Sequence, residues 1–236
     1  MSEAPLRVPT DIPGLDGMLE GGLLKGSNTL LVGGCGCGKS TVAMQYIYNG
    51  ALKDEPGVYI TFEEYPEAIR SNMSRYGWNL DELEKENKMA IMRIDPKDVM
   101  HVIKEDYGEI VDSINDLKAQ RVVIDSISSI EVMIETVFER RENILRLCEW
   151  LRRHKCTSLI TAEAEQSPLT YERHGILEFV VDAVIIQYNI RIGNQRQKAL
   201  EILKMRGTQH AKSIAPFTFG KDGIEVFPHE QVFVDK

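Results

Sequence analysis

Short runs of apolar, β-prone residues recur through the first two-thirds of the chain, and segments with helical spacing separate them. The predicted strands cover residues 30–32, 58–62, 89–94, 121–124 and 157–161. The predicted helices cover residues 40–52, 66–77, 80–87 and 107–118, followed by a strong helix in which the apolar positions are Ile144, Leu147, Cys148 and Leu151. Strands that alternate with helices in this way are typical of an α/β fold with a parallel sheet flanked by helices.

The last third of the chain has a different pattern, in which strand-like runs follow one another with only turns between them. These runs cover residues 183–191, 200–205, 214–219 and 224–227. The turn signals are Gly193-Asn194, Gly207 and Asp222-Gly223. This pattern predicts an antiparallel extension at one edge of a mostly parallel sheet. Because no linker-like stretch or internal repeat interrupts the chain, we expect residues 1–236 to form a single domain.

A glycine-rich turn follows the first predicted strand and leads directly into a helix. Residues 33–40 fit the pattern G-x-x-x-x-G-K-S, and a strand before it with a helix after it is the context of a phosphate-binding loop. The glycines allow successive backbone N–H groups to point at a phosphate, and the helix adds the positive end of its dipole. The alternative is a glycine-rich strand-to-helix turn that binds nothing, and the flanking strand and helix argue against it. The sequence therefore predicts a nucleoside triphosphate site.

The residue types in this loop indicate which residues are expected to contact the phosphates and Mg²⁺. Lys39 is expected to bring a cation to the β- and γ-phosphates, and the Ser40 hydroxyl is expected to be a ligand of Mg²⁺. The predicted nucleotide-binding residues are Gly34, Cys35, Gly36, Cys37, Gly38, Lys39, Ser40 and Thr41.

Acidic residues follow two of the other predicted strands. Asp125 ends an apolar run, and in a parallel sheet this places it at the ligand-binding edge, where it is expected to organise Mg²⁺, through water. On its own it would equally fit a strand-ending cap of the next turn. Glu63 and Glu64 follow the strand at residues 58–62 and are candidates for activating water, the alternative being a solvated pair in a loop.

Composition sets the class of protein. The chain is 43% hydrophobic and 27% charged, which is ordinary for a globular protein, and no apolar run reaches the length of a membrane span. Two of the four cysteines lie in the phosphate loop, which argues against a secreted disulfide framework and for a cytoplasmic protein. The net charge of −8 argues against a dedicated nucleic-acid-binding protein.

These motifs, in this order, resemble a single-domain KaiC-like protein of the RecA-type phosphate-loop ATPase superfamily. The resemblance rests on TDIPGLDGMLEGGLLKGS, GGCGCGKST, TFEEYPEAIRSNMSRYGWNL, RVVIDS, FVVDAVIIQY and KMRGTQHAKSIAPFTF. It implies a RecA-type fold, ATP with Mg²⁺ as the bound cofactors, and ATP hydrolysis in which Glu63 and Glu64 are catalytic.

The resemblance also implies that the chain forms a ring, typically a hexamer. In such rings a cationic segment reaches the phosphates bound by the neighbouring subunit, as an arginine finger does. The matching residues here are Lys204, Arg206, Thr208 and His210. Without the resemblance, the alternating pattern of Lys204 and Arg206 would indicate a solvent-facing strand.

Two departures from the family pattern limit what is carried over. Family members that act in a biological clock phosphorylate themselves on a Ser-Thr pair just before the strand that corresponds to residues 183–188. This chain has Leu177-Glu178-Phe179 at that place, without a hydroxyl group, so autokinase activity is not expected. Cys35 and Cys37 replace the small or hydroxyl residues that are usual in the loop. Lys39 and the helix N-terminus are expected to lower a thiol pKa there, which raises the hypothesis of redox-sensitive nucleotide binding.

The function that these features favour is a slow, ring-forming ATPase that signals its nucleotide state to a protein partner, which the sequence does not name. A nucleotide-dependent binding module with negligible hydrolysis and a RadB-like DNA-repair ATPase remain as alternatives. The loops expected to contact DNA carry acidic residues, which argues against nucleic acid. These residues are Glu131, Glu135, Glu163, Glu165 and Glu172. The predicted helix that carries the basic run at residues 140–155 has glutamates interleaved with its arginines, which indicates a solvated or subunit-facing surface.

Overall fold

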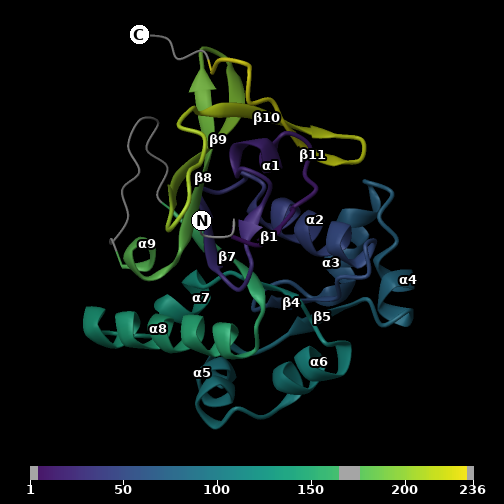
Figure 1. Ribbon diagram of the computed structural model, residues 1–236, viewed down its shortest axis with the longest axis vertical. Coiled ribbons are helices and arrows are strands. Elements are labelled where there is room, and N and C mark those ends of the chain that lie inside the picture. Colours follow the sequence, from purple (N-terminus) through teal and green to yellow (C-terminus); the bar gives the residue numbers. More distant parts are fainter. Residues whose placement is uncertain (1–4, 165–175, 233–236) are drawn as a thin grey trace.

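The computed structural model describes residues 5–164 and 176–232 and is built around one large twisted sheet (Figure 1). In the described residues this sheet has nine strands in the order β11-β10-β9-β8-β3-β7-β6-β4-β5. The strands are β3 (Asn28–Gly33), β4 (Gly57–Thr61), β5 (Met89–Arg93), β6 (Arg121–Asp125), β7 (Thr157–Glu163), β8 (Ala183–Ile192), β9 (Gln195–Met205), β10 (Ala215–Gly220) and β11 (Gly223–Val226).

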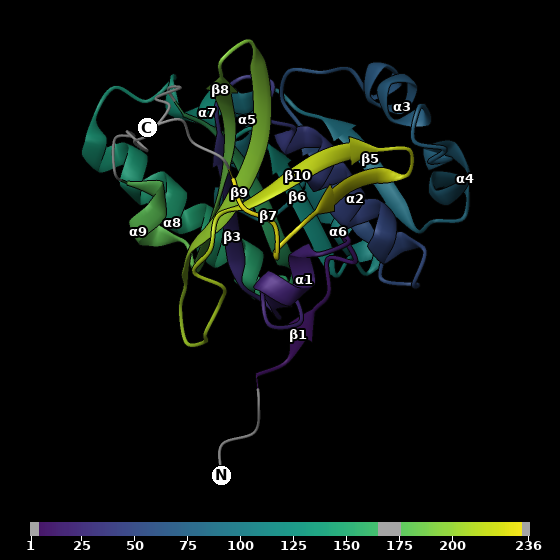
Figure 2. The same ribbon diagram turned by 90° about the horizontal axis from the view of Figure 1, so that it is seen from above.

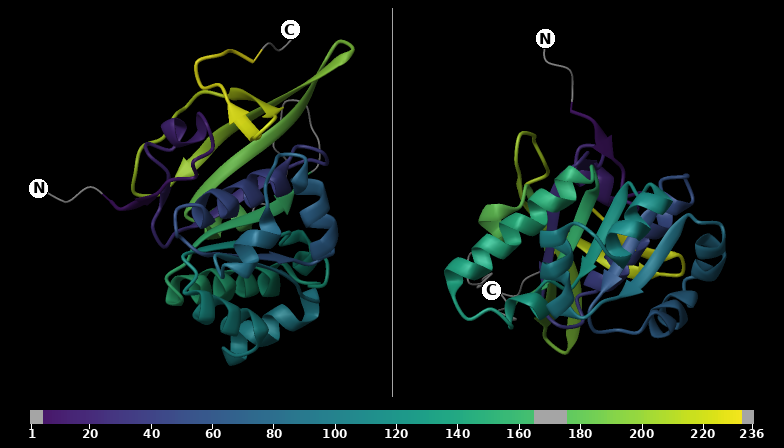
Figure 3. Two further views of the ribbon diagram at one scale, coloured as in Figure 1. Left: turned by 90° about the vertical axis from the view of Figure 1, so that its right-hand side faces the viewer. Right: turned by 90° about the horizontal axis from the view of Figure 1, so that it is seen from below.

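Strand direction divides the sheet into two parts. The six strands β8, β3, β7, β6, β4 and β5 are parallel, so their carboxyl ends meet at one edge. The strands β9, β10 and β11 pair antiparallel beyond β8. The β8–β9 hairpin is the longest of these elements and projects past the helical layers (Figure 3). The predicted parallel sheet with an antiparallel C-terminal edge is confirmed.

Helices cover both faces of the sheet. On one face lie α1 (Leu15–Met18), α2 (Lys39–Ala51), α3 (Pro66–Ser74) and α4 (Leu80–Lys85). On the other face lie α5 (Pro96–Glu105), α6 (Glu109–Leu117), α7 (Ser128–Glu131), α8 (Val137–Arg153) and α9 (Leu177–Val180). In the described part of the chain, none of these helices combines the length and the apolar character needed to cross a bilayer.

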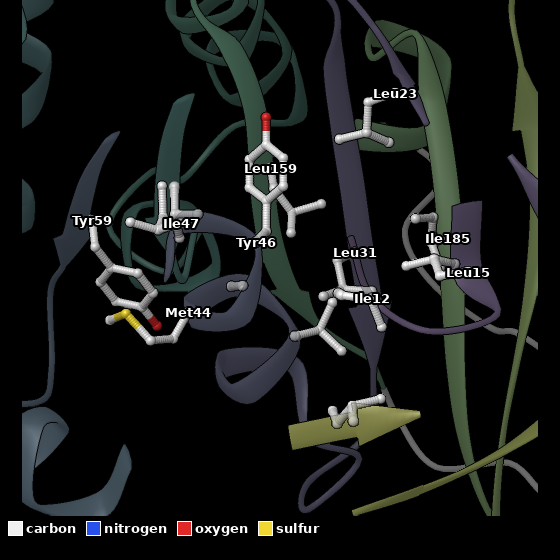
Figure 4. Close-up of a cluster of buried hydrophobic side chains, with 14 of the residues drawn as sticks. Ile12, Leu15, Leu23, Leu31, Met44, Tyr46, Ile47, Tyr59, Leu159 and Ile185 are labelled. Atoms are coloured by element: carbon white, nitrogen blue, oxygen red, sulfur yellow. The ribbon is translucent and has the colours of Figure 1, made fainter. Parts of the chain in front are cut away.

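Alternate residues of the central strands feed two separate cores, because side chains of a strand point to opposite faces. Leu31 of β3 belongs to the same buried cluster as Met44 and Ile47 of α2 on one face (Figure 4). Its neighbours Leu30 and Val32 pack with the buried side of α8 on the other. The predicted apolar stripe of α8 is confirmed, since Ile144, Leu147, Cys148 and Leu151 are all buried.

Several elements were not predicted from the pattern, among them the helix α5 and the strands β1 (Arg7–Val8) and β2 (Leu23–Leu24). Helix α5 begins directly after Asp95, whose carboxylate accepts a hydrogen bond from the Lys97 N–H at 2.9 Å, and Pro96 occupies the first helical position. The Asp-Pro pair stops β5 and also starts this helix. The two-residue strands β1 and β2 form a small antiparallel sheet, which is too short for periodicity to reveal.

Candidate functional site

The phosphate loop is formed where β3 ends at Gly33 and α2 begins at Lys39. Gly36 has φ 70° and Gly38 has φ 95°, values that favour glycine over any other residue. Gly38 also lies close to β10, since a Cβ there would come within 2.5 Å of the Phe219 ring. Backbone conformation and crowding therefore both require the last glycine of the motif.

The Lys39 side chain folds back over the loop. Its ammonium donates hydrogen bonds to the Gly33 carbonyl at 2.9 Å and to the Gly34 carbonyl at 3.1 Å. These carbonyls hold the cation over the loop, whose glycine-rich backbone is of the kind that directs N–H groups at phosphate oxygens. The loop has the donor set for a polyphosphate, and the predicted position of Lys39 agrees with this arrangement.

Asp125 ends β6 at the same carboxyl edge, next to β4 and β7. Its carboxylate accepts hydrogen bonds from the Tyr59 hydroxyl and the Thr161 hydroxyl, which come from these two strands. Burial, followed by the charge of Asp125, raises the pKa of Tyr59 well above its usual value, so the phenol stays protonated. Ser40 also reaches the Tyr59 hydroxyl, which places its oxygen beside this group.

The oxygen atoms of Ser40 and Asp125 are the hard donors that Mg²⁺ prefers, and Mg²⁺ takes its remaining ligands from phosphate and water. Both oxygens of the Asp125 carboxylate are already engaged by hydroxyl groups. The donor set therefore fits the predicted Mg²⁺ site.

Glu63 and Glu64 follow β4, and both are exposed. They contact different elements. The Glu63 carboxylate accepts a hydrogen bond from the Ser129 hydroxyl of α7 at 2.7 Å, whereas the Glu64 carboxylate accepts one from the Asn72 amide of α3 at 3.5 Å. Glu64 is also fixed at its backbone, since its N–H donates to the Thr61 hydroxyl at 3.2 Å. The two acids thus lie at the edge of the sheet that carries the phosphate loop, but with different supports.

The predicted cationic segment, residues 204–210, lies at the amino ends of the parallel strands, whereas the phosphate loop lies at their carboxyl ends. The Arg206 N–H donates to the Asp182 carbonyl and the Asp182 N–H donates to the Asn28 carbonyl, both at 2.9 Å, so Arg206 lies beside the start of β3. The phosphate loop follows the end of β3. In Figure 2 the β8–β9 hairpin points to one side of the molecule and the loop after β9 points to the other. Within one chain, the structure does not bring these residues to the phosphate loop.

The side chains of this segment are held by backbone carbonyls. The Lys204 ammonium donates to the Glu178 carbonyl at 2.6 Å and to the Val181 carbonyl at 2.7 Å, and the Arg206 guanidinium donates to the Phe179 carbonyl at 2.6 Å. Burial lowers the pKa of Lys204, and the charge of Arg206 lowers it further. The solvent-facing alternative therefore does not describe Lys204, which anchors the end of α9. The His210 ring contacts the Ala211 carbonyl at 2.8 Å.

Two residues beside the phosphate loop were missed from the sequence. The Lys198 ammonium of β9 donates to the Gly36 carbonyl and lies 5.2 Å from the centre of the Phe219 ring. Burial lowers the pKa of Lys198, and Arg196 adds to that effect. Both residues line a groove of about 600 Å³ between the β8–β9 hairpin and β10. Strand pairing brings them to the loop from far along the sequence, and no local pattern marks them.

The loop cysteines differ from the expectation. Cys35 is exposed and Cys37 is fully buried, and both are thiols. Burial raises the pKa of Cys37 above its usual value, although Lys39 and Lys198 act in the opposite direction. The predicted lowering of a thiol pKa is therefore wrong for Cys37, because loss of solvent outweighs the nearby charges. The redox hypothesis then depends on Cys35.

Among the acidic residues that argued against nucleic acid, Glu131 is half-buried rather than exposed. Glu135 and Glu163 are exposed beside the ends of β6 and β7, whereas Glu165 and Glu172 lie outside the described residues. On α8, Arg146 pairs with Glu142 at 2.6 Å, which agrees with the expected solvated surface.

Comparison with known proteins agrees with this geometry. A family model described as "ATPase: KaiC" matches residues 8–231. The chain is 38% identical over 233 residues to the circadian clock oscillator protein KaiC of Parasynechococcus marenigrum (strain WH8102), which covers 94% of this chain and 45% of that protein. It is 37% identical over 233 residues to the protein of that name from Synechococcus elongatus (strain ATCC 33912 / PCC 7942 / FACHB-805), covering 96% of this chain and 45% of that protein.

The chain thus spans less than half the length of these relatives. The match nevertheless extends over nearly all of the present sequence, and the fold and the phosphate loop are those of a RecA-type ATPase domain. The chain belongs to the KaiC family of RecA-type phosphate-loop ATPases.

Proposed function

We propose that this chain is an ATP-binding, slowly ATP-hydrolysing protein that assembles into a hexameric ring with the nucleotide at the subunit interfaces. One observation carries the proposal. The phosphate loop follows the end of β3, whereas Arg206 lies beside its start, and a strand from Asn28 to Gly33 separates these points by about 16 Å. A cation at the opposite edge cannot complete the site of its own chain, but it can complete that of a neighbour.

Each subunit would then contribute two half-sites. The phosphate loop with Lys39 holds the triphosphate, and Ser40 with Asp125 holds Mg²⁺, which neutralises charge on the phosphates when bound. Glu63 and Glu64 orient the attacking water, as two acids at the same edge of the sheet. Lys204 and Arg206 of the neighbouring subunit offset the negative charge that develops on the transferred phosphoryl group.

The groove lined by Lys198 and Phe219 would take the nucleoside of ATP. It begins at the phosphate loop, because Lys198 contacts the Gly36 carbonyl and Phe219 packs on Gly38. An aromatic face and a cation beside it suit a purine base, which stacks without requiring a specific hydrogen-bond pattern.

Replacing Phe219 by Ala should therefore weaken ATP binding about tenfold, since base–aromatic stacking contributes about 1–3 kcal/mol. Binding of inorganic triphosphate, measured by calorimetry, should change far less, because it lacks the base. Phe138→Ala is the matched control, since Phe138 is 74% exposed on α8. An equal loss of affinity for ATP and for triphosphate would show that Phe219 only supports the loop.

We propose that turnover is slow and that its product is a conformational state which a protein partner detects. The groove beside the phosphate loop is assigned to the nucleoside of ATP and not to a second substrate. The thiols in the phosphate loop favour the reducing cytoplasm as the site of action. Acidic residues beside the ends of β6 and β7 weigh against a DNA-repair role.

Mixing two variants that are each impaired in a different half of the site tests whether the site is shared. Lys39→Ala should abolish hydrolysis by removing the phosphate-loop cation, and Arg206→Gln should reduce it by removing the cation given to the neighbour. In a mixed ring, about a quarter of the interfaces combine an intact loop with an intact Arg206, so phosphate release should return. Molecular mass measured with and without ATP shows whether the rings form.

Absence of any recovery in mixed rings of the expected mass would contradict sharing of the site between subunits. A chain that stays monomeric with ATP and still hydrolyses it would contradict the ring itself. A ring that binds ATP without measurable phosphate release would favour the binding module.

A further inference from the structure

The segment at residues 204–210 has a second anchor, which comes from the N-terminal part of the chain. One guanidinium nitrogen of Arg7 donates to the Thr208 hydroxyl. Close by, the Ala211 N–H donates to the Met18 carbonyl at 2.9 Å. The segment that carries the proposed in-trans cations is thus tied on one side to α9 and on the other side to residues 7–18.

Arg7 is itself fixed in place. Its other terminal nitrogen donates to the Leu19 carbonyl at 2.6 Å and to the Gly22 carbonyl at 3.0 Å, and its side chain is only 14% exposed. Pairing with Leu24 in the β1–β2 sheet sets the backbone of Arg7. A planar guanidinium can bridge these carbonyls and a hydroxyl at once, whereas the compact ammonium of a lysine cannot.

We infer that Arg7 is a positioning residue for ATP hydrolysis at the neighbouring subunit's site. It acts through Thr208, and it fixes the path of the segment from which Arg206 extends. A displacement of this segment by about 1 Å is enough to lower the rate substantially, because phosphoryl transfer depends on placed charge. The inference rests on the proposed in-trans function and adds a residue that contacts no nucleotide.

The decisive variant is Arg7→Gln, with Glu20→Gln as the matched control. Glu20 lies 3.6 Å from the Arg7 guanidinium but supplies none of its hydrogen bonds, so its loss should leave turnover unchanged. Arg7→Gln should lower kcat about tenfold, with ADP affinity and ring mass unchanged, since the phosphate loop is intact. Arg7→Lys should not restore the rate, because the fork geometry is missing.

Mixing distinguishes this role from a structural one. Arg7→Gln subunits keep an intact phosphate loop, and Lys39→Ala subunits keep an intact Arg7, so mixed rings should recover phosphate release at about a quarter of the interfaces. If Arg7→Gln lowers the melting temperature, Thr208→Val removes the hydroxyl acceptor while Arg7 keeps its bonds to the Leu19 and Gly22 carbonyls, and it should show the same loss and the same recovery.

Normal turnover of Arg7→Gln or of Thr208→Val, in rings where Arg206→Gln is impaired, would overturn the inference and leave the proposed function standing. So would a loss that mixing does not restore while the Lys39→Ala and Arg206→Gln pair does recover. Failure of that pair to recover removes the proposed function, and the role of Arg7 falls with it.

Discussion

Replacing both Glu63 and Glu64 by Gln should abolish ATP hydrolysis while ATP binding is retained. The pair lies at the carboxyl edge of the sheet that carries the phosphate loop, and a positioned acid or base typically contributes 10²–10⁴-fold to a rate. Gln preserves shape and hydrogen bonding but cannot accept a proton. Phosphate release should therefore fall by about a thousandfold, and ATP affinity measured by calorimetry should stay within about twofold.

The single variants should separate the two acids. Glu63 is supported by Ser129 of α7 and Glu64 by Asn72 of α3, so each has a different orientation. Ser129→Ala should then affect only the role of Glu63, and Asn72→Ala only that of Glu64. Glu67→Gln is the matched control, because Glu67 is 79% exposed on α3. Unchanged hydrolysis in the double variant would remove both acids from the mechanism.

Replacing Gly14 by Ala should cause a large loss in the free energy of unfolding. Gly14 has φ 79°, and a Cβ there would lie 2.0 Å from the Val226 carbonyl oxygen and 3.1 Å from the Pro228 ring. The backbone of β11 must move, because this carbonyl is not a flexible side chain. We expect a loss of about 2–4 kcal/mol from backbone strain and overpacking, which lowers the melting temperature by roughly 5–15 °C.

Gly17→Ala on the same helix is the control. Gly17 lies inside α1 with open space around it, and Ala is the better helix former there by about 0.5–1 kcal/mol. Calorimetric melting should therefore shift in opposite directions for the two variants. Equal melting temperatures would mean that the contact between Gly14 and β11 does not hold in solution.

The order of the central strands was predictable because each of them is buried on both faces of the sheet. Val122, Val123 and Ile124 form an uninterrupted apolar run for that reason. The position of Asp125 was predictable for the same reason, because it is the first polar residue after a buried apolar run. The phosphate loop was predictable because its chemistry lies in consecutive residues.

Contacts between distant segments were not predictable. Lys198 reaches the Gly36 carbonyl and Arg7 reaches Thr208 across the fold, and in both cases strand pairing decides which residues meet. The pKa of Cys37 was mispredicted because burial dominates it, and the sequence alone does not show which side chains the folded chain buries. The resemblance supplied the role of residues 204–210, which local spacing alone would have assigned to solvent.

The placement of the phosphate loop and of Arg206 at opposite edges of the sheet also bears on how an assembly would close. Each copy offers one acceptor half and one donor half, so a linear row of n copies contains n−1 complete nucleotide sites and a closed ring contains n. Closing the row creates one additional nucleotide site without adding a subunit. At saturating ATP, the free energy of filling that site favours closure, and removal of ATP removes this preference. Nucleotide concentration would then control the topology of the assembly as well as the occupancy of its sites.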